Sequence, residues 1–281
     1  MINKVSSIIF YPLSDNMSFS SSDYIQIKDW TDVNKFDIRK IYVNHTWRKM
    51  LDELFADNDM VEHIENEINE TLSQLDDKTM LYPKYSCIFK AFEMFSFQNT
   101  KVVFIGQDPY FNSMSVNNCR VPQAYGLSFS VPSDFPIPSS LVNIYKNMLK
   151  FGHLKKMPSH GCLDSWAFQG CLMLNTSLTV IDGSNNKNCH SHVWKKFTDN
   201  VIKYISDNID FVVFVIWGNE AVKKLQLIDL DKHYATISSH PSGLSSNKKM
   251  GSYDAFMDVD HFGKINKQLV EHNKSPIIFN I

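Results

Sequence analysis

The sequence predicts an α/β fold, with a central four-stranded, parallel, twisted sheet flanked by helices on both faces and an N-terminal helical segment before it. From residue 101 onward, short apolar runs alternate with amphipathic stretches. This β-α-β-α-β-α-β order is typical of a parallel sheet whose crossovers are helices. The apolar runs are continuous, as expected for strands that are buried on both faces.

The expected strands are four runs rich in Val, Ile, Leu and Phe. They read VVFIG (102–106), CLMLNTSLTV (171–180), FVVFVIWG (211–218) and HYATISS (233–239). Between them, helical spacing of apolar residues predicts helices at SLVNIYKNMLKFG (140–152), VWKKFTDNVIKYISDN (193–208) and EAVKKLQLI (220–228).

The first 75 residues show two different patterns. Residues 1–40 are rich in Ser, Asp and Asn, with little periodicity, and we expect a polar, partly ordered extension there. From Val43 to Leu75 the chain has helical spacing, with Trp47 and Leu51 on one apolar face. We therefore expect a single domain over residues 41–281.

Composition limits the class of protein. The chain has 281 residues, of which 43% are hydrophobic, so it can bury a sizeable core. No apolar run is long enough for a membrane span, and the N-terminus does not resemble a signal or transit peptide. We therefore expect an intracellular protein that is not secreted. The net charge of −2 argues mildly against a nucleic-acid partner, although a local basic face is compatible with it.

Cysteine usage and short motifs point away from several cofactors. The five cysteines are odd in number and form no CxxC pair, which favours reduced thiols in a reducing compartment. The stretch CHSH (189–192) fits no common zinc spacing, so we expect no metal site. Neither a P-loop nor a GxGxxG motif occurs, and nucleotide cofactors lack support.

Each expected strand ends in polar residues. The endings are GQDPY (106–110), LNTS (174–177), WGNE (217–220) and SSHPSGLS (238–245). In open α/β sheets, ligands bind outside the carboxyl ends of the strands, so Asp108, Asn175, Asn219 and His240 should meet at one crevice. Loops often carry polar residues, and any single ending could be incidental. A carboxylate, two amides and an imidazole together predict a binding site.

These endings form part of an ordered motif set. GQDPY, GLSFSVP (126–132), HGCLDSWAFQGCLMLNTSLTV (160–180), HSHVWKKFTD (190–199) and HPSGLS (240–245) stand in the order and spacing of the family-1 uracil-DNA glycosylases. From about Thr46 to the C-terminus, the chain resembles this family. The likeness implies a uracil-DNA glycosylase-like fold whose catalytic domain is the expected domain over residues 41–281.

The resemblance also implies an activity. It is DNA repair: hydrolysis of the N-glycosidic bond of uracil in DNA, releasing free uracil and leaving an abasic site in base excision repair. It implies a monomer that needs no cofactor or metal and acts on single- or double-stranded uracil-containing DNA, with possible replication or repair partners. The alternative is a glycosylase-fold, DNA-binding replication accessory protein whose catalytic activity is secondary.

The resemblance assigns roles to six residues around the base. Asp108 would orient the attacking water and stabilise positive charge on the sugar, which suits the oxocarbenium-like state of glycosidic cleavage. His240 would donate a hydrogen bond to uracil O2 as the base leaves. Asn175 would bind the uracil edge, because a carboxamide offers both donors and an acceptor. The remaining three are Tyr110, which would block a 5-methyl group, Phe129, which would stack on the base, and Gln107, which would bind uracil and position water.

Further positions resemble DNA contacts. HPSGLS (240–245) would enter the minor groove, with Leu244 as an apolar wedge in the space left by the flipped base. FPIPSSL (135–141) resembles a proline-rich loop with Ser140 near a phosphate. Small hydroxyls and backbone N–H groups can contact phosphates without much net charge. The expected DNA contacts are Ser140, Gly218, Asn219, Pro241, Ser242, Gly243, Leu244 and Ser245.

The chain departs from the family pattern beside the site. Phe111 stands where the family usually has His, and an insertion near 111–122 follows it, with no role that the sequence indicates. Asn219 replaces a Ser, and Gly243 replaces a Pro, which leaves that loop more freedom to lose on ordering. The Asn-, Lys- and Ile-rich composition hints at a large DNA virus, in which case the protein would act in a nucleus or at a virus replication site, and otherwise in the cytoplasm.

Overall fold

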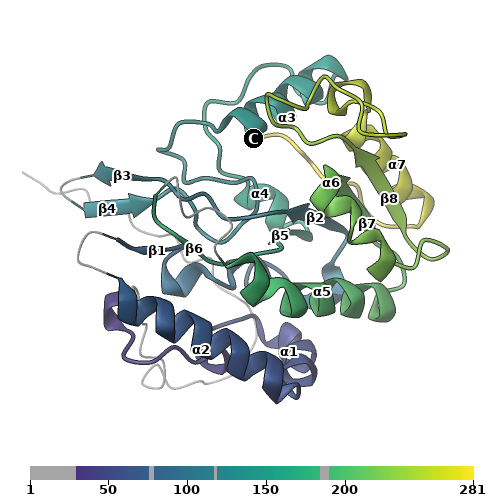
Figure 1. The fold of residues 1–281 in the computed structure, drawn as a ribbon. Helices are drawn as coiled ribbons and strands as arrows, with labels where there is room; N and C mark the ends of the chain where they lie inside the picture. Colours follow the sequence, from purple (N-terminus) through teal and green to yellow (C-terminus); the bar gives the residue numbers. More distant parts are fainter. Residues whose placement is uncertain (1–29, 76–78, 117–118, 184–189) are drawn as a thin grey trace, which may run out of the picture.

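A four-stranded parallel sheet lies at the centre of the structure, a computed structural model that describes residues 30–75, 79–116, 119–183 and 190–281 (Figure 1). Its strands are β2 (Val102–Gly106), β5 (Cys171–Asn175), β7 (Val213–Trp217) and β8 (Tyr234–Ser238), in the order β5-β2-β7-β8. All three pairings are parallel. The predicted fold class is confirmed, and the strands lie where the apolar runs placed them.

The strand order places a crevice at one point of the sheet. The chain runs from β2 to β5 on one side and then crosses back past β2 to β7 on the other. The order therefore reverses between β2 and β7, and ligands of open α/β sheets bind at the carboxyl ends of such strands. Parallel register pairs Gly106 with Asn175 and Trp217 with Ser238, so the polar strand endings lie at the same edge.

Helices cover both faces of the sheet. On one face lie α4 (Asp164–Ala167) and α7 (His261–Glu271), where Trp166 contacts Phe104 of β2 and Phe262 of α7. The helix α5 (Ser191–Asn208) lies on the other face (Figure 1). Two more helices follow strands of the domain or precede them: α3 (Ser139–Lys150) and the short α6 (Asn219–Val222). The helix predicted over 220–228 is shorter than expected, because α6 ends at Val222 and a 3₁₀ turn forms at Leu225–Leu227.

The predicted N-terminal helical segment consists of two helices. The helix α1 (Arg48–Phe55) ends before Asp57, whose side chain accepts a hydrogen bond from Met60 N and caps α2 (Asn58–Gln74). Both helices contact α5 and form an outer layer (Figure 1).

The expected extension over 1–40 lies largely outside the described residues. Its described part, from residue 30, packs against the domain: Trp30, Phe36 and Ile38 are buried in the main core. The Trp30 indole donates to Pro83 O at 2.8 Å, and Phe36 N donates to the Asn69 side chain at 2.8 Å. These residues stabilise α2 and the segment before η4 (Tyr85–Cys87).

Two small antiparallel ribbons lie outside the central sheet. One pairs β1 (Leu81–Tyr82) with β6 (Val180–Ile181), and the other pairs β3 (Ser113–Val116) with β4 (Cys119–Pro122). The second ribbon is the insertion expected near 111–122, which therefore forms a hairpin. None of the helices in the described part of the chain is long and apolar enough to cross a membrane.

The buried His190 stabilises the junction between α2 and α5. Thr71 donates its hydroxyl to Glu67 O, so it accepts from His190 Nε2 at 3.1 Å. On the other side of the ring, Thr179 accepts from the Trp194 indole and donates to His190 Nδ1 at 2.8 Å. Burial is the main cause that lowers the pKa of His190 to about 4. The ring is therefore neutral in the folded protein.

This network predicts acid sensitivity of the fold. The unfolded chain binds a proton at His190 near pH 6.5, whereas the folded chain does so only near pH 4, so stability is full above pH 6.5 and falls as pH drops between these values. Between pH 7 and pH 5, the free energy of unfolding measured by urea titration should fall in the wild type by about 2 kcal/mol more than it falls in His190→Gln. His45→Gln, at an exposed position, is the control. An equal loss in wild type and His190→Gln would contradict this interpretation.

Candidate active site

Asp108 has an unusual environment for a carboxylate. It follows β2 through Gln107, and its Oδ1 atom is buried without a hydrogen-bond partner among the described residues. Burial, and secondly the negative charge of Glu220, raise the pKa of Asp108 to about 6. At neutral pH the group is therefore ionised but poorly solvated. A carboxylate in this state interacts strongly with any positive charge or hydrogen-bond donor that enters the site.

The backbone before Asp108 is held against the end of β5. Gln107 O accepts hydrogen bonds from Thr176 Oγ1 at 3.0 Å and from Ser177 N at 2.9 Å, and Thr176 N donates to Gly106 O at 3.0 Å. The Gln107 side chain is exposed at the mouth of the site. The turn that carries Asp108 is thus fixed by the neighbouring strand rather than free to move.

Asn175 depends on a glycine in the adjacent strand. A Cβ atom at Gly106 would lie 2.2 Å from Asn175 Oδ1 and 2.7 Å from Ser128 Cβ. Any other residue at position 106 would therefore displace the Asn175 side chain. Its carboxamide makes no hydrogen bond within the described part of the chain, and its donors and acceptor are available to a ligand.

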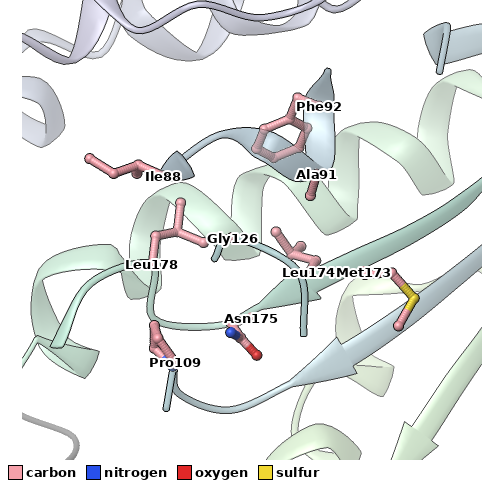
Figure 2. A pocket seen from close by; sticks show the side chains of 9 residues that line it. All are labelled: Ile88, Ala91, Phe92, Pro109, Gly126, Met173, Leu174, Asn175 and Leu178. Atoms are coloured by element: carbon pink, nitrogen blue, oxygen red, sulfur yellow. The ribbon is translucent and has the colours of Figure 1, made fainter. Parts of the chain in front are cut away.

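A small apolar cavity lies behind Asn175. It measures about 10 Å³, and Figure 2 shows Asn175 and Pro109 at one end, with the Asn175 carboxamide pointing away from Ile88, Ala91 and Phe92 at the other. A space of this size holds one water molecule at most. It cannot hold a base, and it forms the rear support of the site rather than the ligand pocket.

His240 follows β8, and its protonation is determined by its contacts. Its Nδ1 atom accepts a hydrogen bond from Ser242 N at 3.0 Å, so the proton of the neutral ring lies on Nε2. Burial lowers the pKa of His240, and the ring is therefore a neutral donor at pH 7. Gly218 has φ +93°, and a Cβ there would lie 3.0 Å from His240 Cβ, so this position favours glycine on two grounds.

Aromatic rings form one wall of the site. Phe129 has φ 62°, a left-handed conformation that is rare for a bulky residue and is typical of functional sites. Its ring lies 5.5 Å from Trp217 and 6.2 Å from His240, measured between centroids. The Tyr110 hydroxyl donates to Phe129 O at 3.3 Å. Burial raises the pKa of Tyr110, which stays protonated.

A crevice of about 270 Å³ lies between the ends of β2 and β7. Of the sequence-predicted positions, Gln107, Gly218, Asn219 and His240 line it. Three other predicted positions are neighbours of the lining residues rather than part of the lining. Asn175 pairs in register with Gly106, and the Phe129 ring contacts Trp217. The charge of Glu220 acts on Asp108. The lining that sequence reasoning missed includes Thr176, Trp217 and Glu220. All three had a signal, since Thr176 belongs to the strand ending LNTS and Trp217 and Glu220 belong to the strand ending WGNE.

The loop after His240 carries an exposed apolar residue. Ser242 O accepts from both Ser245 N and Ser246 N, which makes a tight turn with Leu244 at its tip, 83% exposed. Asn143 of α3 donates to Pro241 O at 2.8 Å and holds this loop to the helix. Ser140 lies at the start of the same helix, so Ser140 and the loop lie on one side of the crevice. Asn143 was not anticipated from sequence.

Metal-ligating side chains do not gather at any point of the described residues: no group of three or more His, Cys, Asp or Glu is placed to hold an ion. Within CHSH, Cys189 lies outside the described residues, and His190 is committed to the threonine pair described above. Cys87, Cys162 and Cys171 are free thiols, whereas the Cys119 side chain, like Cys189, is not described.

The fold and the site define a class of α/β protein with a desolvated carboxylate at the carboxyl ends of its parallel strands, and comparison with known proteins gives this class a family. The model of the uracil DNA glycosylase superfamily matches residues 92–270. The chain belongs to this superfamily.

Individual relatives support the assignment. A protein from Aliarcobacter butzleri named uracil-DNA glycosylase is 38% identical over 83% of this chain and all of its own length. A probable uracil-DNA glycosylase of Acanthamoeba polyphaga mimivirus is 41% identical over 74% of this chain, a match that spans 58% of the mimivirus protein. A crystal structure of mimivirus uracil-DNA glycosylase superposes with a TM-score of 0.83 at 34% identity, over 92% of this chain and 96% of that one.

The charge of Glu220 predicts a measurable effect on Asp108. Glu220→Gln removes the second cause of the raised pKa and leaves burial, so the pKa of Asp108 should fall from about 6 but stay above its ordinary value. Carboxyl ¹³C NMR titration, with Asp108→Asn to assign the resonance, measures this directly. Glu271→Gln, on the remote helix α7, is the control. An Asp108 pKa that Glu220→Gln leaves unchanged would show that the two carboxylates do not interact.

Proposed function

We propose that this chain is a monofunctional uracil-DNA glycosylase of base excision repair, which hydrolyses the N-glycosidic bond of uracil in DNA and leaves an abasic site. The observation that carries the proposal is that a desolvated Asp108 carboxylate follows β2 and a neutral His240, with its proton on Nε2, follows β8 at the same edge of the parallel sheet. The superfamily membership supports it.

Asp108 acts on the sugar. As the bond between C1′ and N1 breaks, the sugar gains positive charge, and a fixed negative charge nearby lowers the barrier. Because the Oδ1 atom accepts no hydrogen bond from the described residues, it gives up no existing hydrogen bond when it interacts with this charge. The other task of Asp108 is to orient a water molecule toward C1′, with Gln107 at the mouth of the site as its second partner.

His240 acts on the base. Uracil leaves as an anion, with charge on O2, and Nε2–H of a neutral imidazole donates a hydrogen bond to that atom. A lowered pKa suits this role, because a neutral donor needs no counter-charge in a site poor in water. The hydrogen bond from Ser242 N keeps the tautomer in place.

Three residues select uracil. The Asn175 carboxamide matches N3–H and O4 of uracil, whereas cytosine presents the reverse pattern and would leave buried polar groups unpaired. The Phe129 ring stacks on the base. Tyr110 blocks the position of the 5-methyl group of thymine.

The target base reaches this site by leaving the DNA stack. Leu244, at the tip of its loop, fills the space that the base vacates. Ser140, Gly218, Asn219, Ser242 and Ser245 are small groups that suit phosphate contacts, and Pro241 and Gly243 shape the loop between them. Single- and double-stranded uracil-containing DNA are both substrates, and the enzyme acts as an intracellular monomer without a cofactor.

The alternative, a DNA-binding replication accessory protein with secondary activity, needs only the DNA-binding loops. It gives no reason to keep a costly desolvated carboxylate and an ordered histidine tautomer at the same edge of the sheet. We therefore favour the enzyme.

A direct assay tests the proposal. With a fluorescent uracil-containing oligonucleotide in EDTA, the wild type should leave alkali-labile abasic product. Asp108→Asn should lose several orders of magnitude in rate and still bind the DNA, because it removes charge at nearly constant shape. Asp134→Asn, at an exposed position, should match the wild type. No abasic product at wild-type excess would refute the activity, and near-normal turnover of Asp108→Asn would refute the role of that residue.

The wedge makes a separate prediction. Leu244→Ala should reduce kcat/KM on double-stranded substrate by roughly 10- to 100-fold, because unstacking there costs a few kcal/mol, and should affect single-stranded substrate far less. Leu230→Ala, at another exposed leucine (51% exposed), is the matched control. Equal losses on both substrates would place Leu244 outside the base-flipping step.

A further inference from the structure

The hairpin β3–β4 follows directly from the catalytic turn. Tyr110 ends the turn that carries Asp108, and Phe111 begins the connection to β3. Tyr110 contacts Phe129, which packs against the main core, through its hydroxyl. Tyr110 and Phe111 also have apolar neighbours outside the main core. Both pack against a separate, small apolar cluster, which we call the satellite cluster: Tyr82, Ala124 and Val180 are buried in it, and Met80 packs against it.

The satellite cluster joins the two ribbons. Tyr82 comes from β1, Val180 from β6, and Ala124 from the segment just after β4. In Figure 1 the two ribbons lie side by side, apart from the central sheet. The ring proposed to exclude a 5-methyl group is therefore supported by a small peripheral cluster, part of which the insertion supplies.

Polar contacts hold the hairpin to the other ribbon. Arg120 of β4 pairs with Asp182 at 2.9 Å between Nη1 and Oδ2. Phe111 O accepts from Gly183 N at 3.3 Å, and Gln123 N donates to Asn112 O at 2.9 Å across the base of the hairpin. These contacts fix Phe111 at its backbone while the satellite cluster fixes its side chain.

Tyr110 itself has little to hold it. Its hydroxyl donates one long hydrogen bond, 3.3 Å, to Phe129 O, and the position of its ring otherwise depends on packing. If the Tyr110 ring can move aside, the site discriminates between bases that differ by one methyl group by only about 10- to 200-fold. Stricter rejection requires neighbours that prevent the ring from moving aside.

We propose that Phe111 and the β3–β4 hairpin are a positioning element for Tyr110, and that they determine how strictly the site rejects pyrimidines with a 5-substituent. The proposal rests on the proposed function, since it gives Tyr110 the role of excluding the 5-methyl group. Phe111, which stands in place of a polar residue of the family pattern, packs against the same satellite cluster as Tyr110. The insertion is thereby part of the specificity of the enzyme.

The test compares thymine and uracil release from the same single-stranded oligonucleotide, in which no base pair has to be opened. Phe111→Ala should raise the ratio of thymine to uracil release at least tenfold, with uracil release within a few-fold of the wild type. Phe111→Leu, which keeps apolar volume, should restore most of the discrimination. Ser115→Ala, exposed on β3, should match the wild type.

Arg120→Gln breaks the ion pair to Asp182 without opening the satellite cluster, and it should raise the same ratio by a smaller factor. If thermal unfolding shows that Phe111→Ala does not fold, the ratio measured for Arg120→Gln tests the positioning role instead. Tyr110→Ala gives the ratio of thymine to uracil release for a site that lacks the Tyr110 ring. If Tyr110→Ala releases thymine while the folded Phe111 and Arg120 variants keep the wild-type ratio, the positioning role is overturned. If the wild type releases no uracil, the proposed function fails instead.

Discussion

The site depends on one constraint: a carboxylate must stay ionised in a place where it is poorly solvated. A chain free to relax would turn Asp108 toward water or provide it with a donor, because an unpartnered buried charge is costly. Here the backbone cannot relax, since β2 ends in a turn that β5 holds through Gln107 O. The stability of the sheet therefore keeps the Asp108 carboxylate in this poorly solvated position, where positive charge that forms beside it lowers its free energy.

The other groups are ordered by the same principle of close support. Glycine at 106 and 218 lets Asn175 and His240 approach the strand ends, where any Cβ would displace them. Behind Phe129 stands Trp217, whose indole donates to the buried His261 at 3.2 Å. Each of these side chains is thus held by a strand end or by a neighbour that is itself fixed. Tyr110 is the exception, since a peripheral cluster supports it.

The sequence was most informative where one physical rule dominates. Continuous apolar runs predict buried parallel strands, and parallel strands bring their ends together, so Asp108, Asn175 and His240 could be placed at one edge. Long-range pairing carries no such local signal. The contact of Asn143 with Pro241 joins residues 98 positions apart. The break at Asp57 and the hairpin at 111–122 are local, because Asp57 caps Met60 N and the hairpin pairs residues at most nine positions apart. Residues 30–40 look polar on average, yet Trp30, Phe36 and Ile38 within this segment are buried in the main core.

The central claim is that Asp108 acts through its charge on a cationic sugar. The most direct measurement is the affinity, with free uracil present, for DNA that holds a protonated pyrrolidine abasic analogue, compared with its neutral tetrahydrofuran isostere. We expect the wild type to bind the cationic DNA at least tenfold more tightly, and Asp108→Asn to lose this preference. Equal affinities in the wild type, or a preference that survives in Asp108→Asn, would contradict the account.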